Sequence, residues 1–150
     1  MKQLKSMLIP LQNIEILLPY STVSEVIASQ SISSIQDMPS WILGRIHWRQ
    51  QEVFLISYEA ALQADSVNQD TAEKKILVIK ALGNDADFRF IALLIDGMPN
   101  LVNVSSDNLT DAADNEALNP LISRRVCVNS REAVIPNIEE IELNVKKSLQ

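Results

Sequence analysis

Three side chains that can carry positive charge alternate along one short stretch of the chain. Between Met38 and Tyr58 a polar break separates two apolar runs. Toward the end of the first run every second residue is basic, namely Arg45, His47 and Arg49. Alternate residues of a β-strand point to the same face, about 6.5 to 7 Å apart, so the three would form a basic row. No carboxylate lies directly beside them in the sequence. The row is therefore predicted to face an acidic partner.

Other residues that could support catalysis are few and far apart. The chain has one histidine, His47, and one cysteine, Cys127, which are remote from each other in the sequence. A Ser-His-Asp, Cys-His or phosphohistidine mechanism would have to use His47, which lies in mid-strand beside Trp48. We therefore interpret His47 as a structural or interface residue and Cys127 as a buried thiol. A single cysteine also excludes an internal disulfide and a cysteine-based zinc cluster.

Acidic residues raise two further possibilities. Asp107, Asp111 and Asp114 suggest calcium, but they lack the central glycine and closing glutamate of a calcium loop, so a solvated acidic loop is favoured. Asp96, between an apolar run and Gly97, superficially resembles the phosphoacceptor of a receiver domain. The acidic pair that such a domain needs is missing, and strands do not alternate with helices. A tight turn is favoured at Asp96, with a phosphorylation switch as the alternative.

Length and composition fit one compact unit. The chain has 150 residues, of which 47% are hydrophobic and 21% charged, and its net charge of -6 argues against nucleic acid or anionic membrane as the main partner. None of the three glycines is spaced for a nucleotide-binding loop. Near the N-terminus, Pro10, Gln12, Asn13 and Glu15 interrupt the apolar stretch before a signal-peptide core or membrane span can form. We predict a cytoplasmic protein without metal or cofactor.

The elements that position these residues are predicted to be mainly β-strands, because apolar residues recur with a period of two. Strands are expected over residues 7–11, 14–18, 26–35, 76–82, 88–95, 101–104, 122–128 and 132–135, with a further hairpin over 42–57. Short helices are expected within 19–25 and 59–64, and a linker over 65–75. A C-terminal helix should begin after Asn137, which can form a cap with Glu140 three residues later. The second half repeats the pattern of the first, which indicates a pair of small barrels.

Two groups of motifs resemble the CheW family of chemotaxis coupling proteins. The first group consists of Val23-Ser24-Glu25-Val26, Met38-Pro39, Gly44-x-Ile46-x-Trp48-Arg49 and Val53-x-Leu55-Ile56. The second is a strand that ends in aspartate, followed by another strand, in residues 91–97 and 101–104. The similarity covers about residues 6–145, and the two groups occur in the order and at the separation typical of the family.

The resemblance implies a mainly β fold of two intertwined five-stranded SH3-like barrels with a few short helices. Subdomain 1 would comprise residues 6–64 and the C-terminal helix, and subdomain 2 residues 76–136. The resemblance also implies a scaffold without catalytic activity, which joins the cytoplasmic tip of a chemoreceptor to the regulatory domain of a CheA-type histidine kinase.

Particular residues follow from the same resemblance. Glu25 and Arg49 are expected to pair, in a contact between the short helix and the hairpin, and Val23 and Gly44 match positions associated with receptor coupling. At Gly44 the missing side chain would allow close approach by a partner or relieve crowding by Trp41 or Trp48, and Val23 could instead belong to the core. The expected partner-binding residues are Val23, Glu25, Gly44, Arg45, His47 and Arg49.

The chain departs from the family pattern inside the first signature. Gln50 stands where glycine is expected, Phe54 where proline is expected, and Ser57 where an acidic residue is expected. Since Gln50 and Gln51 are poorly suited to positive φ values, we expect a longer or differently shaped loop. The W-x-L-G-x-x-x-W-R sequence is similar to auxiliary CheW-like proteins of type IV pilus chemosensory clusters, the ChpC kind. An alternative is a diverged relative that no longer binds the kinase and engages another regulator of pilus or surface motility.

Overall fold

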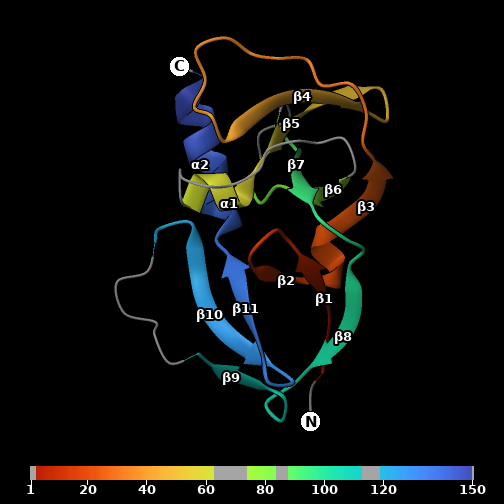
Figure 1. The fold of residues 1–150 in the computed structure, drawn as a ribbon, viewed down its shortest axis with the longest axis vertical. Helices are drawn as coiled ribbons and strands as arrows, with labels where there is room; N and C mark the ends of the chain where they lie inside the picture. The colour runs from red at the N-terminus through yellow and green to blue at the C-terminus, as the bar shows by residue number, and fades with distance from the viewer. Residues whose placement is uncertain (1–2, 63–73, 84–87, 113–118, 150) are drawn as a thin grey trace.

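Two β-sheets make up most of the molecule. The computed structural model describes residues 3–62, 74–83, 88–112 and 119–149, and Figure 1 shows its fold. One sheet has six strands in the order β8 (Asn100–Val104), β1 (Leu4–Pro10), β2 (Glu15–Pro19), β11 (Arg131–Pro136), β10 (Ile122–Val128) and β9 (Leu109–Asp111). The other has five, in the order β3 (Val23–Ala28), β6 (Lys75–Lys80), β7 (Phe90–Ile95), β5 (Gln51–Ile56) and β4 (Ile42–Trp48). The helical segments are the 3-10 turn η1 (Tyr20–Thr22), α1 (Tyr58–Leu62) and α2 (Ile138–Ser148).

Each sheet combines strands from both halves of the chain. The order β8-β1-β2-β11-β10 in one sheet has the same connectivity as β3-β6-β7-β5-β4 in the other, so each half contributes its first hairpin to the sheet of the other half. In both sheets this hairpin makes a parallel pair, β2 with β11 and β7 with β5. The predicted mainly β fold with intertwined halves and a C-terminal helix is therefore confirmed. The subdomain limits at 6–64 and 76–136 stay a prediction. In the structure, each sheet contains strands from both ranges.

The last part of each half repeats at a spacing of 80 residues. The backbone N–H of Ser57 donates to Trp41 O at 2.8 Å, and that of Asn137 donates to Leu121 O at 2.8 Å. Strands β4 and β10 each have a register shift after their first residue, where they pair with β5 and β11. These matched contacts let positions in one sheet be compared with their counterparts in the other.

Several predicted boundaries differ from the structure. Strand β3 covers Val23–Ala28, whereas a strand was predicted over 26–35. It begins earlier than predicted because only η1 separates it from β2. Residues 109–111, expected in an acidic loop, form the short strand β9 and pair with β10. Most of the linker predicted over 65–75 lies outside the described residues. Asp114 lies outside them as well. The cap of α2 is confirmed, since Asn137 Oδ1 accepts from Glu140 N at 3.1 Å.

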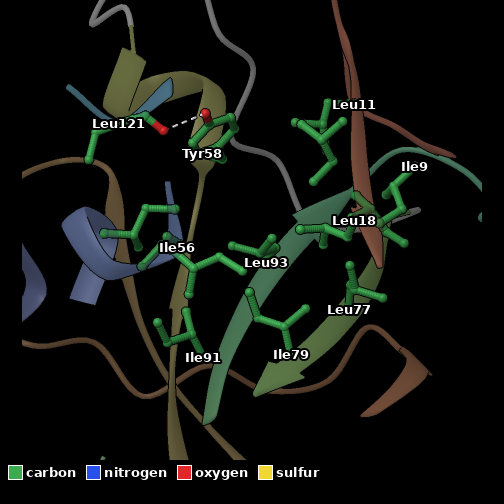
Figure 2. Packing of buried hydrophobic residues seen from close by; sticks show 14 of the residues in the cluster. Ile9, Leu11, Leu18, Ile56, Tyr58, Leu77, Ile79, Ile91, Leu93 and Leu121 are labelled. Carbon is green, nitrogen blue, oxygen red and sulfur yellow. Dashed lines mark hydrogen bonds between the residues drawn. The ribbon is translucent and has the colours of Figure 1, made fainter. Parts of the chain in front are cut away.

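Buried side chains form one large cluster shared by both sheets and two smaller clusters. The large cluster, part of which is shown in Figure 2, includes Ile9 and Leu18 of one sheet and Leu77 and Leu93 of the other. Strand β6 is buried on both faces, because Leu77 belongs to this cluster whereas Val78 belongs to the cluster of the five-stranded sheet. This burial explains its unbroken apolar sequence.

Two buried glutamates tie the helices to hairpin loops. Glu59 of α1 accepts hydrogen bonds from the backbone N–H groups of Gln12 and Asn13, the latter at 2.9 Å. Glu142 of α2 accepts from the N–H groups of residues 82 and 83. Helix α1 follows β5 of the five-stranded sheet and binds the β1–β2 loop of the six-stranded sheet. Helix α2 follows β11 of the six-stranded sheet and binds the β6–β7 loop of the five-stranded sheet. The helices therefore lock the two exchanged hairpins in place.

Tyr58 provides a pH-dependent contribution to stability. Its side chain is 1% exposed and its hydroxyl donates to Leu121 O at 2.8 Å (Figure 2). Burial raises the pKa of Tyr58 well above its ordinary value of about 10, although Arg125 partly opposes the shift. Because the folded pKa is raised, the associated stability is present below the unfolded pKa and is lost as the pH rises above about 10.

Tyr58→Phe tests this contribution. We expect the variant to lose about 1 kcal/mol of unfolding free energy at pH 7, where only the hydrogen bond is removed. Above pH 10 its stability should fall less steeply than that of the wild type, as measured by urea unfolding at both pH values. An equally steep fall in the two proteins would contradict the role given to Tyr58.

Candidate functional site

A tight two-residue turn connects strands β4 and β5. Trp48 pairs with Gln51, which leaves Arg49 and Gln50 as the turn residues, with φ values of 48° and 64°. Positive φ at both central residues is the requirement of a type I′ hairpin turn. The expectation of a longer loop was therefore wrong. A residue other than glycine loses about 1 kcal/mol or more of stability in this backbone conformation. The pairing of the strands overrides the local preference, as it does at Asn129 and Ser130 in the other sheet, whose φ values are 50° and 69°.

The two faces of β4 differ as predicted. Ile42, Gly44, Ile46 and Trp48 are buried, Arg45 is half-buried and His47 is exposed. The charges of the expected basic row are nevertheless largely paired: Arg45 Nη1 lies 3.1 Å from Glu52 Oε2. Glu52 stands opposite His47 in the register of the hairpin, a placement that sequence adjacency could not show. This surface carries both signs of charge and is not a purely basic row.

Glu25 joins β3 to the end of β4. Its Oε1 accepts hydrogen bonds from Trp48 Nε1 at 3.0 Å and from Arg49 Nη2 at 3.3 Å, and Arg49 Cζ lies 4.6 Å from the centroid of the Trp48 ring. The predicted contact between Glu25 and Arg49 is confirmed, but Glu25 belongs to β3 and not to the short helix. The part played by Trp48 was not predicted. We call these three residues the Glu25 unit.

The Glu25 unit contacts an exposed cation on one side. The side chain of Arg49 is 64% exposed and that of Glu25 is 42% exposed. An exposed ion pair of this kind contributes at most about 1 kcal/mol, and a surface cation–π contact adds about 0.5 to 1 kcal/mol. The contacts therefore matter chiefly because they favour one orientation of the Arg49 guanidinium at the end of the hairpin.

Gly44 makes room for the protein's own chain. Its φ is 145°, and a Cβ added there would lie 2.4 Å from Ser33 O and 2.6 Å from Ile32 Cγ2. Ser33 and Ile32 occupy that space, not Trp41 or Trp48, which corrects the expected crowding by a tryptophan. Ser33 and Arg45 exchange two backbone hydrogen bonds of 2.9 Å beside it. The segment that contains Ser33 therefore covers the outer edge of β4.

The remaining candidate positions lie nearby or elsewhere in the fold. Val23 starts β3 and is half-buried against the large core cluster, two residues from Glu25. The backbone N–H of His47 donates to Gln30 Oε1 at 3.2 Å. The six predicted partner-binding residues thus come from the two edge strands of the five-stranded sheet and from the turn that follows β4.

Two of the acidic residues considered in the sequence, Asp96 and Asp111, have basic partners. Asp96 Oδ1 lies 3.4 Å from Lys74 Nζ, and the Asp96 N–H donates to Pro10 O at 2.9 Å. Asp111 pairs with Arg124, whose hydrogen bond lowers the pKa of Asp111 below its ordinary value. In the part of the chain that the structure describes, no group of three or more His, Cys, Asp and Glu residues could hold a metal ion. Among the described helices, none has the length and hydropathy needed to cross a membrane.

Comparisons with known proteins agree on the fold. Residues 5–143 match the family model of the CheW-like domain. The crystal structure of the scaffolding protein TtCheW from Thermoanaerobacter tengcongensis is similar with a TM-score of 0.73 and 15% sequence identity, over 91% of this chain and 90% of that one. At that identity the structural similarity shows the fold alone. A search of curated protein sequences finds no match.

Proposed function

The chain belongs to the CheW-like domain family, and from this membership we propose that it couples chemoreceptor tips to the regulatory domain of a CheA-type histidine kinase. It is a non-catalytic scaffold of chemotaxis signalling, so its activity consists of protein contacts. The observation that best supports a particular contact surface is the Glu25 unit, whose contacts favour one orientation of Arg49. An oriented guanidinium binds a partner carboxylate with little further loss of side-chain entropy.

The proposed partner surface has a charged part and a supporting part. Arg49, Arg45 and His47 supply the exposed or half-exposed polar groups, and Glu25 orients the first of them. Val23 adds apolar surface beside Glu25. Gly44 acts indirectly, since its close packing holds the covering segment at Ser33 against β4. Charges of both signs at an interface determine which partner binds and how it is aligned more than they raise the affinity.

We further propose that the protein belongs to the ChpC-like branch and acts in the cytoplasm, in a type IV pilus chemosensory system that controls twitching motility. The W-x-L-G-x-x-x-W-R sequence supports this proposal, because one of its tryptophans, Trp48, is part of the Glu25 unit. A change of the residues that hold Arg49 would alter which kinase or receptor the surface accepts.

Titration calorimetry with the kinase regulatory domain of the same organism tests the proposed surface. Such contacts are transient, so we expect micromolar binding by the wild type and a loss of about tenfold or more in Arg49→Glu. Arg124→Glu is the matched control: it also reverses an exposed, ion-paired arginine, but in the six-stranded sheet, and should bind as the wild type does. Equal binding by all three proteins would contradict the placement of the surface at Arg49.

The substitutions at Gln50, Phe54 and Ser57 favour a second candidate, a diverged relative that engages another regulator of pilus or surface motility. Absence of any kinase binding by the wild type would support this candidate. A phosphorylation switch at Asp96 predicts instead that acyl phosphate labels the wild type but not Asp96→Asn.

A further inference from the structure

Strands β4 and β10 have counterpart outer edges, on the side of each strand that faces away from its hairpin partner. The outer edge of β10 is paired through its backbone along its second half. Arg125 O accepts from Ala112 N at 3.0 Å, the residues that follow pair with β9, and Asn129 N donates to Asn108 O at 3.0 Å. Backbone groups therefore cover this edge as far as the hairpin turn.

The outer edge of β4 is covered in this way only at its middle. Ser33 and Arg45 exchange two backbone hydrogen bonds of 2.9 Å. Two residues further along the strand, the backbone N–H of His47 donates to a side-chain oxygen, Gln30 Oε1, at 3.2 Å. A side chain thus takes the place that the backbone of β9 has in the other sheet.

Chain length explains this difference. Ala28 and Val104 are counterparts, because each pairs with the first residue of a hairpin strand, β6 and β1 respectively. Four residues separate Ala28 from Ser33, whereas seven separate Val104 from Ala112. The additional residues of the second half include those of β9. The first half lacks them, and side chains reach the end of β4 instead.

The edge at His47 is accessible to a partner. His47 is exposed, Gln30 is half-buried, and the hydrogen bond between them lies at the surface. The nearby side chain of Arg49 is 64% exposed. A backbone carbonyl of another chain can replace Gln30 Oε1 as the acceptor with little loss, since one surface hydrogen bond is exchanged for another. Each further backbone hydrogen bond along the edge would then favour binding.

We propose that an extended segment of a partner protein adds to the outer edge of β4 at His47, as β9 adds to β10. A backbone carbonyl of the segment accepts the His47 N–H in place of Gln30 Oε1. The segment runs antiparallel to β4 in the register of β9, and an acidic residue near its N-terminal end lies beside Arg49. This edge adjoins the surface proposed for the kinase and receptor, but the inference requires neither protein.

The probe for this edge is a peptide that copies residues 107–112, Asp-Asn-Leu-Thr-Asp-Ala, with acetylated and amidated ends. It is titrated into the full chain and followed by two-dimensional amide NMR. We expect binding in the millimolar range, because a short flexible peptide loses entropy when it becomes a strand. Shifts should centre on the His47 amide and the Gln30 side-chain amide. The same peptide with proline in place of threonine lacks the central N–H and should cause none.

Two variants of the protein test the proposed hydrogen bond in opposite directions. Gln30→Ala removes the competing acceptor, so the affinity for the peptide should rise about threefold or more, a gain that impaired folding would not produce. Gln36→Ala, at an exposed position of the same connection, is the matched control and should bind as the wild type does. His47→Pro removes the N–H from an edge where proline is tolerated, and should abolish binding as read at the Ile46 and Trp48 amides.

Three results would overturn the proposal. The first is the absence of shifts near His47 in both the wild type and Gln30→Ala up to about 20 mM peptide. The second is an affinity that is unchanged in Gln30→Ala or in folded His47→Pro, which would place the peptide elsewhere. The third is a shift of the His47 amide when the protein concentration is raised without peptide, which would identify a second copy of the chain as the occupant.

Discussion

Gly44→Ala is expected to lower the free energy of unfolding by about 3 to 5 kcal/mol, the largest effect of any substitution proposed for the hairpin. Two costs add together. The φ of 145° disfavours a residue with a side chain, and the new Cβ would lie 2.4 Å from a backbone oxygen, Ser33 O. Backbone atoms cannot move aside as a flexible side chain would, so the segment covering β4 must shift.

Urea unfolding of Gly44→Ala beside Gly83→Ala measures this cost. Gly83 has no positive φ, and a Cβ added there would meet its nearest atoms, Glu142 Oε2 and Lys146 Nζ, at 3.7 and 3.8 Å. The control should therefore stay within about 0.5 kcal/mol of the wild type. Equal stability of the two variants would show that the covering segment is not fixed against Gly44.

Glu142→Ala is expected to cost about 2 to 3 kcal/mol. Glu142 is 4% exposed, and its Oε1 accepts from the N–H groups of both Leu82 and Gly83. Removal of the carboxylate leaves two donors without their acceptor and opens space beneath α2. Because this contact ties α2 to an exchanged hairpin, the loss should appear in the global unfolding transition.

Two further variants separate the hydrogen bonds from other effects of charge. Glu142→Gln keeps an acceptor oxygen and should recover part of the loss. Glu139→Ala removes an exposed carboxylate from the first turn of the same helix and should cost about 0.5 kcal/mol or less. A loss for Glu139→Ala as large as that for Glu142→Ala would mean that helix charge, not the loop contact, determines the effect.

Features set by local sequence were predictable. Alternation of apolar residues gave the hairpins, including the buried face of β4, and Asn137 with Glu140 gave the start of α2. The pairing of Glu25 with Arg49 was expected from the motif resemblance and not from residue chemistry alone. The three-residue strand β9 was missed because so short a segment has too few alternating positions to be distinguished from a loop.

Features set by tertiary contacts were not predictable. The ion pair of Arg45 with Glu52 depends on hairpin register, and the crowding at Gly44 comes from Ser33, eleven residues earlier in the sequence. The positive φ values at Arg49 and Gln50 contradict local preference, because strand pairing on both sides fixes the turn. The role of Glu142 depends on a contact between residues 60 positions apart.

Co-sedimentation tests the coupling role most directly. Membrane vesicles that carry a chemoreceptor of the same organism are mixed with its CheA-type kinase, with and without this protein, and the kinase in the pellet is measured. We predict that the kinase sediments with the vesicles only when the protein is present, and that Arg49→Glu reduces this fraction while Arg124→Glu does not. If the protein leaves the sedimented kinase unchanged, it does not couple receptor to kinase.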